Sequence, residues 1–266
     1  MYLSLPERVL EHFKKENIDL FYADTVDSTN KRARIYAQQP SQLIGRAVLF
    51  VAEGQSEGRG RLGRSFFSPD GTGLYMTLLI PAPANDGFSC LTALTSVAVC
   101  EAVVEIFKLE LGIKWVNDLY LDGKKVAGIL AEAFEVGESR YVAIGIGINL
   151  TTEDFPDGLS QKAGSLTGGI EREELCALKI ALAFSISKKL LGTLESGDIS
   201  VKMEKYRESS CVLGKRIRFT LGEGMREGEV VGITDGGALR VRLSSGELTE
   251  LSSGEISVFS VDGKWN

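Results

Sequence analysis

The segment 57–71, EGRGRLGRSFFSPDG, contains the residues of this chain that are best suited to hold an anion. Gly58 to Arg64 places three glycines and three arginines in seven positions. Adjacent arginines repel each other and glycine loses the most entropy on ordering, so neither residue type suits a packed core. Arginine donates charge-assisted hydrogen bonds to phosphate, and glycine lets the backbone approach a ligand. The composition fits a flexible loop that closes over an anionic ligand, or a solvated loop with incidental charge.

The same glycines match G-x-G-x-x-G, the pattern of dinucleotide-binding turns. That pattern must open a helix, but here RSFFSPDGTG follows, and Pro69, Gly71 and Gly73 prevent a helix. The P-loop pattern G-x-x-x-x-G-K-[ST] is absent from the chain. The sequence therefore argues against both of these standard phosphate-binding turns.

Histidine and cysteine usage excludes several chemistries. His12 is the only histidine, in the polar run EHFKKE where we expect a solvated helix face. Histidine-dependent triads, Cys-His pairs and histidine zinc sites are therefore nearly excluded. The four cysteines, Cys90, Cys100, Cys176 and Cys211, form no CxxC pair, so we expect reduced and mostly buried thiols.

Composition and charge are those of an ordinary globular protein with room for a large core and a small second domain. The chain has 266 residues, of which 44% are hydrophobic and 25% charged, and a formal net charge of -6. The acidic balance argues against a general affinity for nucleic acid. No secretory signal and no run of eighteen apolar residues are present, so we expect a cytoplasmic protein.

The hydrophobic patterns indicate strands and helices that position the loop. Residues 46–53 and 73–80 read as strands on either side of it, and 113–121, 124–135 and 140–150 read as consecutive strands. Helices are expected over 30–39, 88–111 and 171–195. From Val212 the chain changes to short strands with glycine-rich turns, which is typical of a small barrel. We place a domain boundary near residue 211.

Four motifs together resemble those of biotin protein ligases, in the order that this family has. They are DSTN at 27–30, EGQSEGRGRLGRSFFSPDGTGLY at 53–75, KWVNDLYLDGKKVAGILAE at 114–132 and GIGINL at 145–150. The resemblance covers roughly residues 21–260 and implies an α+β fold, with a mixed central sheet, helices packed on one face and a C-terminal SH3-like β-barrel. It divides the chain into a short N-terminal extension at 1–20, a catalytic domain at 21–210 and the barrel at 211–266.

The resemblance also implies an activity. Biotin and ATP, with Mg²⁺, give biotinyl-5'-adenylate, and a lysine of a biotin carboxyl carrier protein then takes the biotinyl group. Both steps depend on positioning and charge neutralisation, so no histidine is needed. In this family the loop is mobile without ligand and folds over biotin and the adenylate.

The resemblance assigns site residues by motif. Lys114 and Arg61 are expected at the reacting carboxylate and α-phosphate, where a cation stabilises the developing charge. The expected biotin-binding residues are Ser28, Thr29, Asn30, Gln55, Arg59, Gly60, Arg61 and Lys114. The expected nucleotide-binding residues are Arg61, Arg64, Asn117, Asp118, Lys125, Gly128 and Asn149, with Asp118 also a candidate magnesium ligand, and Gly145 and Gly147 join Asn149 in the floor of the site.

Simpler interpretations of these residues stay open from the sequence alone. Asp27 to Asn30 would also cap a helix, and Asn117 and Asp118 would also form a turn. Lys114 would otherwise be an exposed lysine at a strand end. Gly145 and Gly147 would otherwise relieve crowding in a core strand.

Three departures from the family pattern stand out. Val116 replaces the usual proline of KWPND, and Phe66 replaces the tryptophan of many relatives. Only about twenty residues precede the catalytic region, too few for a three-helix DNA reader, so no repressor function and no DNA partner are expected. The resemblance allows a homodimer formed through the sheet, and no membrane partner is expected.

Two alternative functions are kept. A lipoate or octanoate ligase has the same catalytic fold, but the RR-x-x-GG motif of that family is absent. A non-catalytic binder of biotin or adenylate would keep the loop, but the intact Lys114 argues against it.

Overall fold

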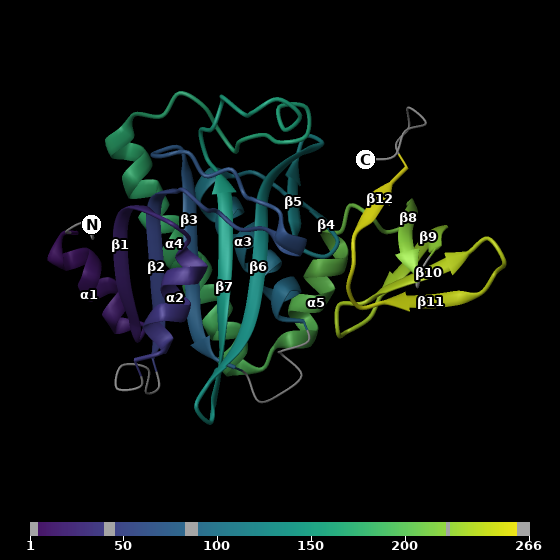
Figure 1. The fold of residues 1–266 in the computed structure, drawn as a ribbon, viewed down its shortest axis with the longest axis horizontal. Helices are drawn as coiled ribbons and strands as arrows, with labels where there is room; N and C mark the ends of the chain where they lie inside the picture. Colours follow the sequence, from purple (N-terminus) through teal and green to yellow (C-terminus); the bar gives the residue numbers. More distant parts are fainter. Residues whose placement is uncertain (1–4, 40–45, 83–89, 222–223, 260–266) are drawn as a thin grey trace.

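The structure is a computed structural model that describes residues 5–39, 46–82, 90–221 and 224–259. A larger part is built on one sheet, and a smaller C-terminal part lies beside it (Figure 1). Within the described ranges, no helix is long and apolar enough to cross a bilayer.

The larger part contains a seven-stranded sheet with the order β1-β2-β3-β7-β6-β5-β4. Its strands are β1 (Ile18–Val26), β2 (Ala47–Gln55), β3 (Gly73–Pro81), β4 (Gly112–Lys114), β5 (Asp118–Leu121), β6 (Lys124–Val136) and β7 (Ser139–Asn149). Strand β1 is parallel to β2, and every other neighbouring pair is antiparallel. The predicted mixed sheet is therefore confirmed.

Helices α3 (Leu91–Phe107) and α4 (Arg172–Ser196) pack together on one face of this sheet and form the main core with it. Helix α3 is apolar on nearly every side, and eleven of its residues are buried, as its sequence indicates. Helices α1 (Glu7–Lys15) and α5 (Ile199–Glu208) complete this layer. On α1, the exposed His12 lies against the Phe184 ring with centroids 4.4 Å apart, so it has a packing contact as well as solvent.

Helix α2 (Thr29–Ala37) lies on the opposite face, in front of the sheet in Figure 1. The expectation that all helices pack on one face needs this correction. Ala33 and Ala37 are buried against Val48, Phe50 and neighbouring side chains of the sheet. Their small side chains let a short helix lie close to the strands, which leaves the rest of this face to other residues.

The C-terminal part is a five-stranded antiparallel sheet with the order β11-β10-β9-β8-β12. The strands are β8 (Arg216–Leu221), β9 (Gly224–Ile233), β10 (Leu239–Leu243), β11 (Leu248–Leu251) and β12 (Ile256–Val258). Residues 260–266 of the expected barrel lie outside the described residues. Trp115 is buried between the two parts and its Nε1 donates to the Gly237 carbonyl oxygen at 2.8 Å.

The arginine loop, residues 57–71, joins the antiparallel strands β2 and β3. Its helical structure is limited to a short 3-10 turn at Arg61–Gly63, with Leu62 and Gly63 at φ 55° and 75°. The loop thus leads into a strand and not into a long helix, as expected from the glycines and proline that follow it.

Candidate active site

The floor of the candidate site is the face of β7 that carries α2. Gly145, Gly147 and Asn149 alternate along β7 with isoleucines that point into the main core. A Cβ on Gly145 would overlap the Asn30 side-chain oxygen, and one on Gly147 would lie 2.5 Å from the Phe66 ring. These glycines let α2 and the arginine loop lie directly on the strand, which a core strand alone would not require.

A buried polar cluster stands at the start of α2. Gln55 Oε1 accepts hydrogen bonds from the Thr29 backbone N–H at 2.8 Å and from the Thr29 hydroxyl at 3.0 Å. The Thr77 hydroxyl lies 2.8 Å from Thr29 Oγ1 and 2.6 Å from Asn30 Oδ1. The DSTN motif and Gln55 are therefore brought together as the resemblance implies.

Ser28 is the residue before α2, and its side chain makes no capping hydrogen bond there. It is buried, with its backbone N–H donating to Asp27 Oδ1 at 2.8 Å. The capping interpretation of this serine is not borne out, and Ser28 is buried next to Thr29 and Asn30 in the chain.

Two residues of this cluster were missed from the sequence. Thr77 is fully buried, and a hydroxyl in the apolar run LYMTLLI was the signal that could have identified it. Glu132 accepts from Asn30 Nδ2 at 2.9 Å and lies 3.6 Å from the Arg59 guanidinium. Glu132 thus links the cluster to the arginine loop.

The arginine loop is folded back on itself above this face. The Phe66 N–H donates to the Gly58 carbonyl at 2.8 Å, and the Gly60 N–H donates to the Arg64 carbonyl at 2.7 Å. Gln55 Nε2 donates to Ser68 Oγ at 3.1 Å, which ties the loop to the cluster.

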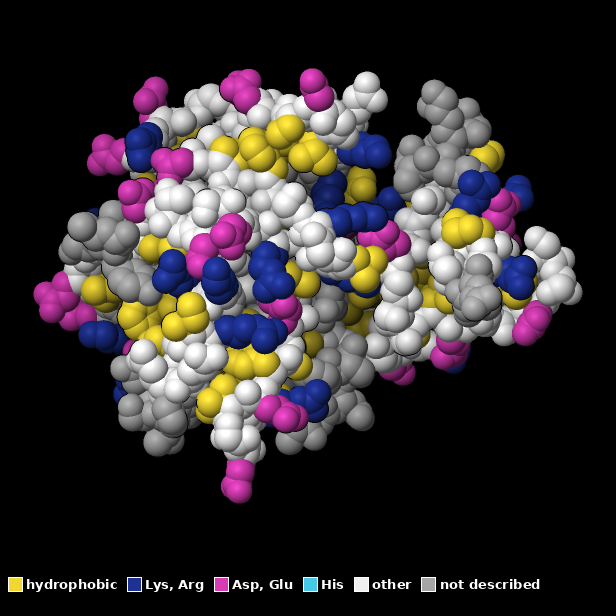
Figure 2. Space-filling view, viewed as in Figure 1, with side chains coloured by type: hydrophobic (Ala, Val, Ile, Leu, Met, Phe, Trp, Pro, Cys, Tyr) yellow, Lys and Arg dark blue, Asp and Glu magenta, His cyan; other side chains and the backbone are white. Residues whose placement is uncertain are grey.

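The arginines of the loop reach both parts of the molecule. Arg61 donates to Asn117 Oδ1 at 3.2 Å and to the Gly254 carbonyl at 3.0 Å. Arg64 makes an ion pair of 2.6 Å with Glu255 on the C-terminal part. Figure 2 shows Lys and Arg side chains gathered on this face, along the hollow beside the C-terminal part.

A second cationic group comes from the KWVND segment and β6. Lys125 Nζ lies 2.6 Å from Asp118 Oδ1, and a Cβ on Gly128 would lie 3.3 Å from Lys125 Nζ. Asn117 Nδ2 donates to the Ile129 carbonyl at 2.9 Å, which fixes the amide that faces Arg61. Arg61 therefore contacts Asn117, and Lys125 contacts the next residue along the chain, Asp118.

Lys114 ends β4, and its ammonium lies 5.5 Å from the centroid of the Tyr120 ring. Burial lowers the pKa of Lys114 from its ordinary 10.5, against the opposing effect of the Asp118 carboxylate. Burial also raises the pKa of Tyr120 to about 12. A half-buried lysine beside other cations is the arrangement expected of a group that meets an anionic substrate.

Asn149 closes the floor beside the segment around residue 164. Its Nδ2 donates to the Gly164 carbonyl at 3.0 Å, while its buried Oδ1 has no hydrogen-bond partner among the described residues. A buried acceptor without a partner is costly, so this oxygen is free to accept from a bound molecule.

Val116, where the family pattern has proline, follows a cis peptide bond and its carbonyl accepts from the Tyr206 hydroxyl at 3.3 Å. Phe66, where many relatives carry tryptophan, lies over Gly147 with its ring centroid 6.4 Å from that of Tyr75.

Comparison with known proteins identifies the arrangement. Residues 22–149 match the model of the "Biotin/lipoate A/B protein ligase family", and residues 212–258 match that of the "Biotin protein ligase C terminal domain". The chain is 32% identical to the bifunctional ligase/repressor BirA of Bacillus subtilis, over 85% of this chain and 70% of the relative. It is also 32% identical to the biotin--[acetyl-CoA-carboxylase] ligase of Paracoccus denitrificans, over 83% of this chain and 92% of the relative.

A solved structure agrees in fold. The biotin protein ligase of Aquifex aeolicus in complex with biotin and ATP superposes with a TM-score of 0.71 and 30% identity, over 90% of this chain and 97% of that one. With the motifs gathered on one face of the sheet and both family models matched, the chain belongs to the biotin protein ligase family.

Proposed function

We propose that this protein activates biotin with ATP and transfers it to a lysine of a biotin carboxyl carrier protein. The observation that carries the proposal is the placement of a buried polar cluster beside a group of cations on one face of the sheet. A carboxylate oxygen of biotin attacks the α-phosphorus, the bond to the β-phosphate breaks and pyrophosphate leaves. The carrier lysine then attacks the acyl carbon of biotinyl-5'-adenylate, and AMP leaves as the amide forms.

The polar cluster is proposed to bind the ureido ring of biotin. That ring offers one carbonyl and two N–H groups, which hydroxyls, amides and loop backbone can satisfy in a buried pocket. We assign this role to Ser28, Thr29, Asn30 and Gln55, with Arg59 and Gly60 of the loop. Thr77 and Glu132 orient the Asn30 amide, because one contacts its oxygen and the other its nitrogen.

The cationic groups are proposed to hold the phosphates. Lys114 and Arg61 neutralise the reacting carboxylate and α-phosphate, whose mutual repulsion otherwise opposes attack. The remaining nucleotide contacts are assigned to Arg64, Asn117, Lys125, Gly128 and Asn149. The folded loop would also keep water from the mixed anhydride, which hydrolyses readily.

Magnesium is expected to arrive with ATP. The described residues contain no group of three His, Cys, Asp or Glu side chains that could hold a metal. Asp118 offers one carboxylate beside the Asn117 amide, which fits an ion held mainly by phosphate oxygens and water. When bound, Mg²⁺ would neutralise charge on the phosphates of ATP.

Two further expectations remain predictions from the sequence, namely a cytoplasmic location and the absence of DNA binding. The resemblance also allows a homodimer formed through the sheet.

The deciding experiment incubates the chain with Mg²⁺, a biotin carboxyl carrier domain and either biotin or lipoate, with and without ATP. We expect biotin to label the carrier lysine only when ATP is present, and lipoate to give essentially no label. Intact-mass measurement of the carrier reads out both acids in the same way. Labelling by lipoate at a comparable rate, or no labelling by biotin, would overturn the proposal.

A further inference from the structure

A buried ion pair lies beneath the arginine loop, on the core side of the sheet. Lys179 of α4 and Glu53 near the end of β2 approach to 2.6 Å, with side chains only 2% and 10% exposed. Lysine and glutamate are rarely buried, because removing their charges from water is unfavourable even when they are paired. Because this buried ion pair is an unfavourable way to stabilise the fold, we expect it to have a further role.

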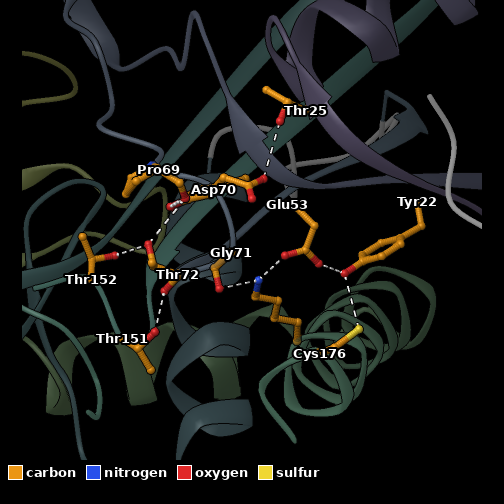
Figure 3. A network of polar contacts seen from close by, with 12 residues as sticks. Tyr22, Thr25, Glu53, Pro69, Asp70, Gly71, Thr72, Thr151, Thr152 and Cys176 are labelled. Atoms are coloured by element: carbon orange, nitrogen blue, oxygen red, sulfur yellow. Dashed lines mark hydrogen bonds and ion pairs between the residues drawn. The ribbon is translucent and has the colours of Figure 1, made fainter. Parts of the chain in front are cut away.

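The pair holds the backbone where the loop ends. Lys179 Nζ, the nitrogen drawn between Gly71 and Glu53 in Figure 3, donates to the Gly71 carbonyl at 3.0 Å. The Gly71 N–H in turn donates to the Glu53 backbone carbonyl at 3.0 Å. Both backbone polar groups of Gly71 are therefore satisfied by Lys179 and Glu53. Gly71 has a φ of 77°, a left-handed conformation at which the chain turns into β3.

The strand that leads into the loop carries Glu53, the other member of this pair. Glu53 stands two residues before Gln55, whose side-chain Oε1 accepts two hydrogen bonds from Thr29. Lys179 therefore ties the outgoing end of the loop to the strand end from which the loop departs. A shift of Gly71 would move the loop relative to Gln55.

The surroundings of the pair are also fixed. The Tyr22 hydroxyl donates to the second Glu53 carboxylate oxygen and lies 3.6 Å from Cys176 Sγ (Figure 3). The Thr72 carbonyl accepts from the Thr151 N–H at 2.9 Å, which attaches the residue after Gly71 to the segment that follows β7. The base of the loop is thus held from β1, α4 and this segment, while the arginines extend over the other face.

We propose that Lys179 acts through Glu53 and Gly71 as a positioning residue for biotin ligation. It fixes the base of the arginine loop so that Gln55 and Arg61 close together on the acyl-adenylate. The inference rests on the proposed function for its substrate. Lys179 itself lies on the core side and contacts neither the polar cluster nor the cationic group.

Two variants of the full chain remove the ammonium. Lys179→Met keeps the apolar stem but leaves the Glu53 charge buried without its partner. Glu53→Gln/Lys179→Met removes both charges together and keeps an acceptor for the Tyr22 hydroxyl. Measurements use whichever variant keeps the parental circular dichroism spectrum, and loss of the fold in both would assign the pair to folding and overturn the proposal.

Two control variants match these changes. Lys188→Met makes the same substitution on the same helix, at an exposed lysine paired with Glu16. Tyr22→Phe removes the hydrogen bond to Glu53 but leaves the contacts of Lys179 to Glu53 and Gly71 in place. If the contacts around Glu53 were merely structural, Tyr22→Phe and the Lys179 variants would change hydrogen exchange and the product ratio in the same way.

The first measurement is hydrogen exchange of residues 57–71 without ligand and with biotin, ATP and Mg²⁺. In the Lys179 variants we expect faster exchange in the ligand-free chain and loss of any protection that ligands add. The ligand-free comparison does not depend on the proposed function. Parental exchange in a folded Lys179 variant would overturn the inference.

The second measurement is the ratio of free biotinyl-5'-adenylate to carrier-bound biotin. We expect this ratio and KM for biotin to rise about ten-fold in the Lys179 variants, because a loop displaced at its base closes less well. Both controls should keep the parental ratio. Failure of the parent to biotinylate would refute the proposed function, whereas equal ratios in all variants would refute the role of Lys179.

Discussion

Strand β7 places isoleucine and glycine on opposite faces of the main sheet. Ile144, Ile146 and Ile148 are buried in the core with α3 and α4. Gly145 and Gly147 turn to the other face, where Asn30 and Phe66 lie directly on them. One strand thus packs into the core on one side and lets α2 and the arginine loop approach its backbone on the other, through a strict alternation of two residue types.

The isoleucine face of β7 adds to the stability of the fold, whereas the glycine face lowers it. Burying an isoleucine stabilises the folded state by roughly 1.5–3 kcal/mol, whereas glycine inside a strand has no side chain to pack and loses more entropy on folding. Glycines at 145 and 147 are unfavourable for a strand as such. Their place is explained by the residues that approach them.

The largest expected effect follows from the same alternation in β4. Ile113 is fully buried in the core, so the adjacent Lys114 turns to the opposite face of the sheet, the face on which Gly145 and Gly147 lie. We expect Lys114→Ala to lower adenylate formation by roughly 10²- to 10³-fold, the scale for removing a preorganised charge, with little change in the melting temperature. Pyrophosphate release and a thermal melt measure the two quantities. Lys14→Ala on the exposed side of α1 is the control, and unchanged pyrophosphate release would remove Lys114 from the mechanism.

The next effect tests the glycine face directly. An alanine Cβ at position 147 would lie 2.5 Å from the Phe66 ring, so the ring must move by about 1 Å to reach ordinary contact. We expect Gly147→Ala to lower kcat/KM for biotin by up to about 10²-fold, because a displacement of that size in a site can cost that much. Steady-state kinetics with the carrier domain measures it.

Gly192→Ala is the matched control, because a Cβ at this helical glycine of α4 meets nothing within 4 Å. It should leave kcat/KM unchanged and raise stability by about 0.5–1 kcal/mol. A similar kinetic loss in both variants would mean that β7 has no special face.

Local patterns predicted most of the main sheet, because apolar alternation is a local signal. Composition singled out the arginine loop, and the resemblance joined it to DSTN and KWVND; the structure brings these motifs together. The position of α2 on the face opposite α3 and α4 was not predicted, because a helix of low amphipathicity does not indicate which side of a sheet it covers.

The missed contacts share a physical reason. Glu53 and Lys179 are 126 positions apart, and each reads alone as an ordinary charged residue in its segment. Only the packing of α4 on β2 makes them a pair. Thr77 and Glu132 were missed for the same reason, since their partners come from α2 and the arginine loop.

A smaller effect concerns pH. Burial lowers the pKa of Lys114 from 10.5. In the proposed mechanism the cation is the form that meets the phosphate. Activity should therefore be present below this pKa and fall as pH rises through it, with a midpoint below 10.5 in kcat/KM, which reports the free enzyme. Lys114→Arg should remove this alkaline limb, because guanidinium keeps its charge. An identical limb in the arginine variant would assign it to another group.

The smallest expected effect lies on the isoleucine face, one residue from Gly147. Ile146 is buried among α3 and α4 side chains, so Ile146→Val deletes one methylene and leaves a small cavity that the core fills only in part. We expect unfolding in urea to show a loss of about 0.5–1.5 kcal/mol, with the kinetic constants for biotin unchanged. The valine also stays β-branched, so the strand geometry and the adjacent glycines are not disturbed. If Ile146→Val instead raises KM for biotin, the two faces of β7 are mechanically coupled. Core packing by the isoleucines and biotin binding over the glycines would then not be independent.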